Sequence, residues 1–231
     1  MNIAIIPARG GSKRIHRKNI KNFHGKPIIA YSIETARKSG VFDRIIVSTD
    51  DLEIAEVAKN YGAEVPFIRP SNLADDHTGT LAVLGHALSW LEKSNLIVDY
   101  ICCIYATSPF LSAQALIEGK KCITSLNLNY AFSATEYNFP IQRAFYFNQK
   151  DKITMFQPEH LSSRSQDLTP AYHDAGQFYW CAPNAIKELK PFFSAQSSAI
   201  LIPKHLVHDI DTIEDWKRAE LAYKILQNRK P

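Results

Sequence analysis

The chain has 231 residues, of which 45% are hydrophobic and 22% charged, so it is long enough to bury a sizeable core. Its net charge of +4 comes from 27 basic and 23 acidic residues, and seven of the basic residues precede the first carboxylate, Glu34. A positive charge confined to one short segment argues against a nucleic-acid-binding protein, whose basic face is usually broad, and indicates a small polyanionic ligand.

Targeting and redox features are sparse. No apolar run approaches the roughly 20 residues that cross a bilayer, and Pro7 and Arg9 interrupt the apolar segment that a signal peptide requires. The four cysteines form no C-x-x-C pair, and Cys102 and Cys103 lie inside an apolar run. Free thiols are therefore expected rather than disulfides or a zinc site. We expect a cytoplasmic protein that binds neither membranes nor nucleic acid.

The first half of the chain alternates the patterns of strands and helices. Pro27 suits the first turn of a helix, Gly40 and Gly62 suit helix ends, and Asp50 or Asp51 can cap a second helix. The predicted strands cover 2–8, 44–49, 64–68 and 99–105, and the predicted helices cover 27–39, about 51–61 and 80–94. This order predicts a single α/β domain over 1–231, with a largely parallel sheet and helices on both faces.

The pattern changes between residues 130 and 175. Residues 144–155 are typical of a two-stranded ribbon whose turn lies at 148–151, and 157–176 are polar. We expect 130–175 to form an insertion that protrudes from the sheet and makes a dimer contact. The last predicted elements are strands at 176–182 and 199–203 and a helix at 212–227.

The most informative segment is the basic loop that follows the first strand. Gly10 and Gly11 are followed by closely spaced cations, and the early cations are Arg9, Lys13, Arg14, Arg17, Lys18, Lys21 and Lys26. Glycine lets backbone N–H groups approach phosphate oxygens, and Lys and Arg neutralise their charge. The alternative is a solvated basic surface, the usual meaning of a charge run. The position at a strand end favours polyphosphate binding, because ligands of parallel sheets bind outside the carboxyl ends of the strands.

Two familiar nucleotide loops do not match. His16 stands where the second glycine of a Walker A loop belongs, and the third glycine of the dinucleotide-binding fingerprint is missing. Asp50 nevertheless resembles the ribose-binding acid of dinucleotide folds, so an NAD-dependent oxidoreductase stays open as an alternative. A non-catalytic nucleotide-binding module is a further one.

A pair of late carboxylates is a candidate metal site. Asp209 and Asp211 lie two residues apart, and on extended backbone such side chains point the same way. Their hard oxygen atoms suit Mg²⁺, which keeps several waters and shares phosphate oxygens. The alternative is that Asp211 only caps the last helix.

Several motifs together resemble a known family. The run Pro7-Ala-Arg-Gly-Gly-Ser-Lys-x-x-x-x-Lys-Asn19 resembles the signature of the cytidylyltransferases that activate sialic acids and related nonulosonic acids as CMP-sugars. Further matching motifs in the same order are 42–50, Arg69-Pro70 with Asp75-Asp76, 107–109, 164–166 and 209–211. The resemblance implies a Rossmann-like α/β nucleotidyltransferase with a small dimerisation insert, which acts as a homodimer on CTP and a nonulosonic acid.

The resemblance also implies roles for individual residues. Arg9, Ser12 and Lys18 would bind the CTP phosphates, and Asn19 and Arg69 would lie near the cytidine. Mg²⁺ would bind at Asp209 and Asp211, so that Arg9, Lys18 and Asp211 carry catalysis. The candidates for contact with the sugar are Tyr105, Thr107, Ser108, Arg164, Gln166 and Asp174. The general base is not identifiable from these motifs; a metal-bound water and Asp174 are the options.

The sugar end departs from the sialic acid pattern. Tyr105-Ala106 stands where those enzymes tend to have Gln-Pro, and this segment, together with 172–180, resembles the pseudaminic acid branch of the family. We expect Tyr105, Phe110 and Phe178 to line the sugar pocket and to favour the terminal methyl of pseudaminic acid over a hydroxyl. N-acetylneuraminic and legionaminic acid remain the alternative substrates.

Overall fold

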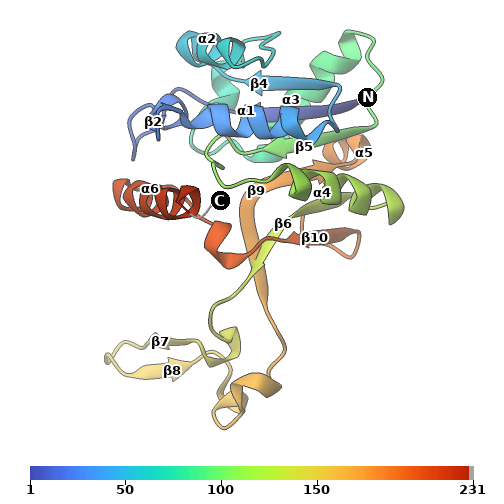
Figure 1. Ribbon diagram of the computed structural model, residues 1–231. Helices are drawn as coiled ribbons and strands as arrows, with labels where there is room; N and C mark the ends of the chain where they lie inside the picture. The colour runs from blue at the N-terminus through green and yellow to red at the C-terminus, as the bar shows by residue number, and fades with distance from the viewer. Residues whose placement is uncertain (229–231) are drawn as a thin grey trace.

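The computed structural model describes residues 1–228 and is built on a six-stranded sheet with the order β10-β6-β9-β5-β1-β4 (Figure 1). The strands are β1 (Asn2–Pro7), β4 (Arg44–Ser48), β5 (Tyr100–Ile104), β6 (Tyr130–Glu136), β9 (Tyr172–Cys181) and β10 (Ser197–Leu201). Strand β9 is antiparallel to both of its neighbours, and the other neighbouring pairs are parallel. The predicted α/β fold with a mostly parallel sheet is confirmed.

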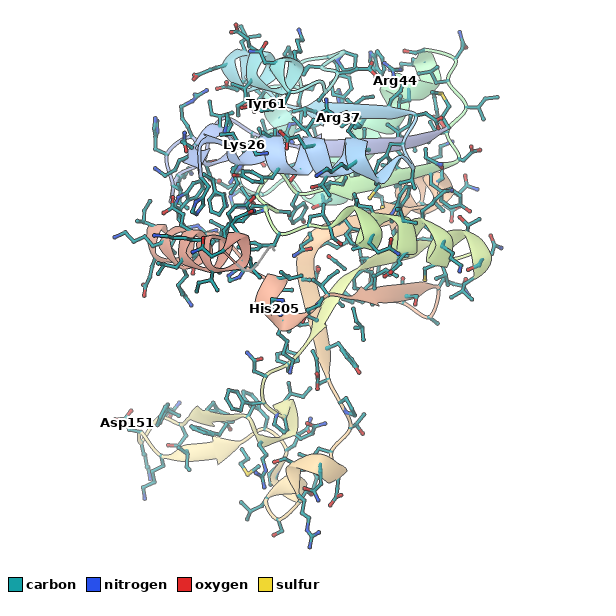
Figure 2. The ribbon with its side chains drawn as sticks, in the orientation of Figure 1. Lys26, Arg37, Arg44, Tyr61, Asp151 and His205 are labelled. Atoms are coloured by element: carbon teal, nitrogen blue, oxygen red, sulfur yellow. The ribbon has the colours of Figure 1, made fainter. Side chains whose placement is uncertain are left out.

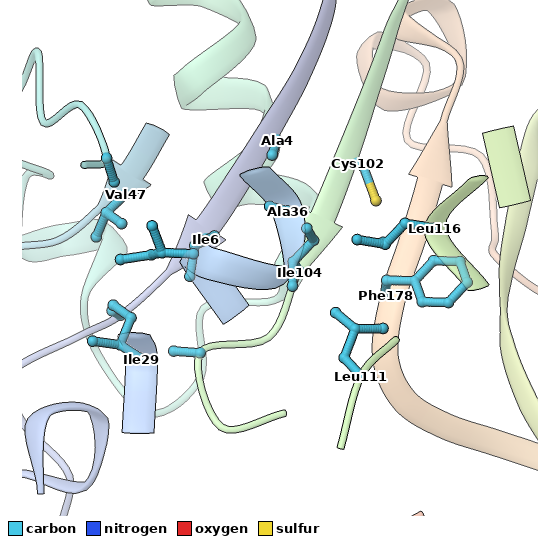
Figure 3. Packing of buried hydrophobic residues seen from close by; sticks show 14 of the residues in the cluster. Ala4, Ile6, Ile29, Ala36, Val47, Cys102, Ile104, Leu111, Leu116 and Phe178 are labelled. Atoms are coloured by element: carbon cyan, nitrogen blue, oxygen red, sulfur yellow. The ribbon is translucent and has the colours of Figure 1, made fainter. Parts of the chain in front are cut away.

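Helices cover both faces of this sheet. They are α1 (Ile28–Ser39), α2 (Leu52–Asn60), α3 (Thr80–Lys93), α4 (Ala113–Ser125), α5 (Pro183–Lys187) and α6 (Ile213–Gln227). Successive side chains of β1 point to opposite faces, so Ala4 and Ile6 join one core with α1, α2 and α4 (Figure 3). Ile3 and Ile5 join the opposite core with α3 and α5.

A third, smaller core holds α6 beside the basic loop. Ile15 and Phe23 come from the segment after β1, and they pack with Ile210 and Trp216 at the start of α6. A capping box fixes this end of the helix, because the hydroxyl of Thr212 accepts from the backbone of Asp215 and the Asp215 carboxylate accepts from the backbone of Thr212. Residues 209–211 are thereby placed against the loop.

Several helix boundaries follow the predicted chemistry. Gly40 ends α1 with a φ of 66°, and Asp51 caps α2 by accepting from the Ile54 backbone N–H. Helix α4 was not predicted, although Ser112 gives it an ordinary N-cap. The short elements are β2 (Asn22–Phe23), β3 (Lys26–Pro27) and 3₁₀ turns at Lys18–Ile20, Ser71–Leu73, Ile141–Arg143, Pro158–His160, Ser165–Asp167 and Lys204–Leu206.

The predicted strand at 64–68 is wrong. Only Glu64 pairs with the sheet, in a single bridge to Ile46, and Pro66 has no N–H to continue a ladder. The chain then turns back, so that the Arg69 backbone N–H donates to the Thr49 carbonyl at 2.7 Å. This return brings Arg69 to the end of β4.

A long segment, residues 137–171, extends away from the sheet between β6 and β9; we call it the protrusion. It holds the predicted ribbon, formed by β7 (Phe145–Phe147) and β8 (Ile153–Met155), and Asp151 lies near its tip (Figure 2). The protrusion is shorter than the expected 130–175, because Tyr130–Glu136 form an almost wholly buried strand of the main sheet.

The cysteines and the helices bear on the expected redox state and on membrane spanning. All four cysteines are free, and Cys102, Cys103 and Cys181 are buried. No helix within residues 1–228 has the length and apolar character of a membrane span.

Candidate active site

A cleft of about 360 Å³ opens at the carboxyl ends of β1 and β5. The chain passes from β1 to β4 on one side and then to β5 on the other, so β1 is the switch point where ligands of such sheets bind. Of the residues singled out from the sequence, those that line this cleft are Arg9, Ser12, Lys18, Asn19, Arg69, Tyr105, Thr107 and Asp211.

The early cations divide into two groups. Arg9, Lys13, Arg14 and Lys18 line the cleft. The remaining three have structural partners: Lys21 lies 5.5 Å from the Trp216 ring centre, Lys26 pairs with Glu34 at 2.5 Å, and Arg17 binds Asp51. Phosphate binding therefore stays a prediction for the four cations in the cleft, and the other three have structural partners instead.

Each of the four loop cations in the cleft is paired with a carboxylate. Arg9 lies 2.6 Å from Asp76, which also pairs with Lys13. Contact with Lys13, and then with Arg9, holds the pKa of Asp76 below its usual range. Across the cleft Asp211 binds Arg14 at 2.8 Å and Lys18 at 3.1 Å. An anionic ligand in the cleft would bind the same cations, so it would compete with these two carboxylates.

Arg69 is the one cleft cation that is almost fully buried, with 4% of its side chain exposed. Its Nε and Nη2 atoms have no hydrogen-bond partner among the described residues, and the nearest carboxylate, Asp50, is 3.8 Å away. Burial lowers the pKa of Arg69. Buried N–H groups without partners are costly, so a ligand that accepts from them would bind favourably here.

Two contacts tie the start of the loop to its surroundings. The Gly10 backbone N–H donates to Asp50 at 3.0 Å, and the Asn19 side-chain amide donates to the Arg9 carbonyl at 2.9 Å. Lys18 also donates to the Ile210 carbonyl at 2.7 Å. The loop is therefore held in place between β4 and residues 209–211.

The late carboxylates are arranged unequally. Asp211 lines the cleft, whereas Asp209 is not among the lining residues. Partial burial, and then the neighbouring charge of Asp211, raise the pKa of Asp209. The capping alternative for Asp211 is wrong, because Thr212 supplies the N-cap oxygen. Within residues 1–228 no group of three or more His, Cys, Asp or Glu side chains is placed to hold a metal ion.

Tyr105 occupies the end of the cleft beside α3. Its hydroxyl shares a hydrogen bond of 3.0 Å with the hydroxyl of Thr80, and its ring centre lies 5.5 Å from that of Tyr179. Asp174 is already engaged, accepting from the Tyr179 hydroxyl at 2.5 Å and from the Gly176 backbone N–H at 2.8 Å.

The aromatic lining expected around Tyr105 is wrong in two places. Phe178 is fully buried and points into the core between Leu111 and Leu116 (Figure 3). Phe110 packs in the core beneath α6. Ser108 is also buried and is not among the cleft residues, so only Thr107 of the Thr-Ser pair reaches the cleft.

Arg164 and Gln166 are remote from this cleft within one chain. Both are exposed on the protrusion, which hangs away from the sheet (Figure 1). Gln166 instead borders a shallow groove of about 250 Å³ with residues near the base of the protrusion, such as Tyr137 and Lys204.

The family resemblance gave no individual role to Lys13, Arg14, Asp76 and Thr80, which also line the cleft. The two cations belonged to a run whose individual directions depend on loop conformation. From the sequence, Asp76 was recognised only as one member of an acidic pair, and Thr80 only as the first residue of a predicted helix.

Comparisons with known proteins bear on these observations. A protein of Campylobacter jejuni subsp. jejuni serotype O:2 named pseudaminic acid cytidylyltransferase is 49% identical over 224 residues, which are 97% of each chain. The N-acylneuraminate cytidylyltransferase of Escherichia coli O18:K1:H7 is 32% identical over 98% of this chain and 52% of its own length. A CMP:2-keto-3-deoxy-manno-octonic acid synthetase complexed with CTP shares the fold, with a TM-score of 0.68 at 15% identity over 98% of this chain and 99% of that one.

The family model described as cytidylyltransferase matches residues 3–222, a span that includes the basic loop, Arg69, Tyr105 and Asp211. With a match over nearly its whole length and a relative at 49% identity, this chain belongs to the cytidylyltransferase family.

Proposed function

We propose that this chain transfers CMP from CTP to the anomeric hydroxyl of pseudaminic acid and releases pyrophosphate. The observation that carries the proposal is the cleft at the end of β1, where four loop cations converge with a buried Arg69 whose Nε and Nη2 lack hydrogen-bond partners, in a chain 49% identical to a pseudaminic acid cytidylyltransferase. The NAD-dependent alternative is not retained, because the chain belongs to the cytidylyltransferases.

Charge and geometry suggest how CTP binds. Arg9, Ser12 and Lys18 would contact the triphosphate, and fixed cations there stabilise both the nucleotide and the leaving pyrophosphate. Asn19 and Arg69 would lie toward the cytidine. The unpaired N–H groups of Arg69 can donate to a carbonyl or hydroxyl oxygen of the nucleotide. CTP would then displace Asp76 from Arg9 and Lys13.

Asp209 and Asp211 fit a magnesium ion. The oxygens of both carboxylates are ligands that Mg²⁺ prefers. Partial burial and the charge of Asp211 raise the pKa of Asp209, and a divalent cation would offset both effects. When bound, Mg²⁺ would neutralise charge that develops on the phosphates. Asp211 also pairs with Arg14 and Lys18, so this carboxylate would connect the cations of the basic loop with the metal site.

The sugar would lie beside Tyr105 and Thr107. Arg164 and Gln166 can reach it only from another subunit, since both are exposed on the protrusion of their own chain. The protrusion also carries large exposed apolar side chains, among them Phe139, Phe147 and Phe156. We therefore propose a homodimer in which each protrusion covers the partner subunit's cleft. Asp174 would act by positioning Tyr179 rather than by touching the sugar. We also propose a cytoplasmic location, with the four cysteines reduced.

The test is pyrophosphate release from CTP and Mg²⁺ with pseudaminic, N-acetylneuraminic and legionaminic acids. We expect kcat/KM for pseudaminate to exceed that for N-acetylneuraminate by at least about tenfold, because a tyrosine in place of an amide changes what the sugar can hydrogen-bond. Equal rates, or a preference for N-acetylneuraminate, would reject pseudaminate as the substrate and leave the cytidylyltransferase reaction intact. If none of the three acids gave pyrophosphate release, the proposed reaction would be rejected.

A further inference from the structure

Arg17 is a loop cation that turns away from the cleft. Its guanidinium donates two hydrogen bonds to the Asp51 carboxylate, at 3.1 Å from Nη1 and 2.9 Å from Nη2. Glu53 lies 2.8 Å from the same guanidinium but is largely exposed. Arg17 is not among the cleft residues, whereas its neighbours Arg14 and Lys18 are.

Asp51 contacts both ends of the loop. It caps α2 and binds Arg17, and it also lies so close to Gly10 that a Cβ there would fall 2.6 Å from an Asp51 carboxylate oxygen. Only glycine fits at that approach. Gly10 follows Arg9 and Arg17 precedes Lys18, so the two proposed phosphate ligands are each adjacent to a residue that rests on Asp51.

The backbone of Arg17 supports the same conclusion. Its φ of 50° and ψ of 38° are left-handed, a conformation that is unfavourable for a residue with a Cβ and is usually given to Gly or Asn. Such a strained backbone persists only where surrounding contacts hold it in place, and here the two hydrogen bonds from the Arg17 side chain to Asp51 provide that support.

We propose that Arg17 and Asp51 form a strut that positions the loop from Arg9 to Lys18 for the triphosphate, with Arg17 a positioning residue rather than a phosphate ligand. The proposal rests on the proposed function of the cleft. The strut fixes the spacing between Arg9 and Lys18, so its loss would leave both cations present but misplaced. Nucleotide affinity and turnover would then fall while the sugar site is unaffected.

The experiment compares Arg17→Ala, Asp51→Asn and the double variant. Asn caps a helix about as well as Asp, so Asp51→Asn removes the charged pair and keeps the cap of α2. We expect each single variant to lower kcat/KM for CTP about tenfold with an unchanged KM for the sugar, and the double variant to be no worse than either, because both remove one interaction. Arg17→Lys restores little, since an ammonium cannot make the paired contact.

A second bidentate pair provides the control. Arg44 binds Glu64 through Nη2 and through Nε, which lies 2.9 Å and 3.1 Å from the two carboxylate oxygens. This pair is at the start of β4 and thus at the opposite end of the strand from Asp51 (Figure 2). Glu64→Gln should lower the melting temperature to a similar extent as Asp51→Asn without changing kcat/KM. Arg17→Gly serves if Arg17→Ala folds poorly, because Gly adopts the left-handed conformation without strain.

Three results would overturn the strut. Variants that lose melting temperature but keep kcat/KM would make the pair purely structural, and strictly additive losses would mean that Arg17 contacts the phosphates itself. Binding of CTP and of inorganic tripolyphosphate, measured by calorimetry, separates this proposal from the reaction. If the wild type binds both but transfers no CMP, the proposed function fails while the variants still report on the strut through affinity. A wild-type protein that binds neither would overturn both.

Discussion

At the scale of single residues, the cleft contains cations that differ in role from those just outside it. Lys18 contacts Asp211 and the Ile210 carbonyl within the cleft, whereas Lys21, three residues on, is exposed and lies over Trp216. Lys18→Ala should lower turnover by ~10²–10³, the usual cost of removing one donor to transition-state charge. Lys21→Ala should leave turnover unchanged. Steady-state kinetics with melting curves for both variants would decide whether position, rather than total charge, matters.

Asp76 is expected to compete with the nucleotide. It holds Arg9 and Lys13 in the absence of a ligand, and these pairs must break when a triphosphate binds. Asp76→Asn should therefore strengthen CTP binding about two- to tenfold, because pairs between partly exposed side chains contribute little each. Asp75→Asn is the matched control, since Asp75 also lines the cleft but, among the described residues, pairs with no cation and accepts only from His77 and Thr78 in a local turn. Weaker CTP binding by Asp76→Asn would instead assign the carboxylate to the bound state.

At the scale of elements, two helical glycines should respond oppositely to alanine. A Cβ at Gly119 of α4 would lie 2.6 Å from Trp180 and 2.8 Å from Phe178, whereas one at Gly85 of α3 meets nothing within 4 Å. Gly119→Ala should cost about 1–3 kcal/mol of stability through overpacking. Gly85→Ala should stabilise by up to about 1 kcal/mol through helix propensity. Denaturant unfolding of both variants measures the difference, and equal signs would contradict the packing of α4 against β9.

The elements also show which parts of the fold the sequence reveals. Strand β1 with its loop, the Gly40 end of α1 and the Asp51 cap of α2 were predictable, because apolar runs, glycine and capping side chains are local signals. Strand β6 was not, because the buried hydroxyls of Ser133 and Thr135 interrupt the apolar run expected of a strand buried on both faces, and their hydrogen-bond partners are distant in sequence. The antiparallel course of β9 depends on pairing with β5 and β6, which are distant in sequence.

The candidate site was predictable in composition and less so in geometry. The motifs brought together Arg9, Lys18, Arg69 and Asp211, all of which line one cleft. The direction of each loop cation was not predictable, because it depends on tertiary partners such as Asp51 for Arg17. The roles expected at Phe110 and Phe178 failed for the same reason: their cores were not visible from local sequence.

At the scale of the whole molecule, the protrusion and the cleft have to be joined across subunits if Arg164 acts on the sugar. Arg164 is exposed on the protrusion, and Lys18 lies in the cleft of the body. In a dimer with exchanged protrusions, each complete site takes Lys18 from one subunit and Arg164 from the other. Two inactive variants, Lys18→Ala and Arg164→Ala, should therefore complement each other when mixed.

The expected recovery follows from symmetry. Equal mixing makes half of the dimers mixed, and each mixed dimer holds one site with both residues intact and one with neither, so about a quarter of the wild-type activity should return. If Arg164 served its own subunit's cleft, every site would lack one residue and no activity would return. Sedimentation of Phe147→Ser, which removes an exposed apolar side chain from the ribbon, supplies the parallel measurement of assembly. A monomeric wild-type protein with full activity would exclude a shared site, because the apolar protrusion would then have no partner subunit to cover.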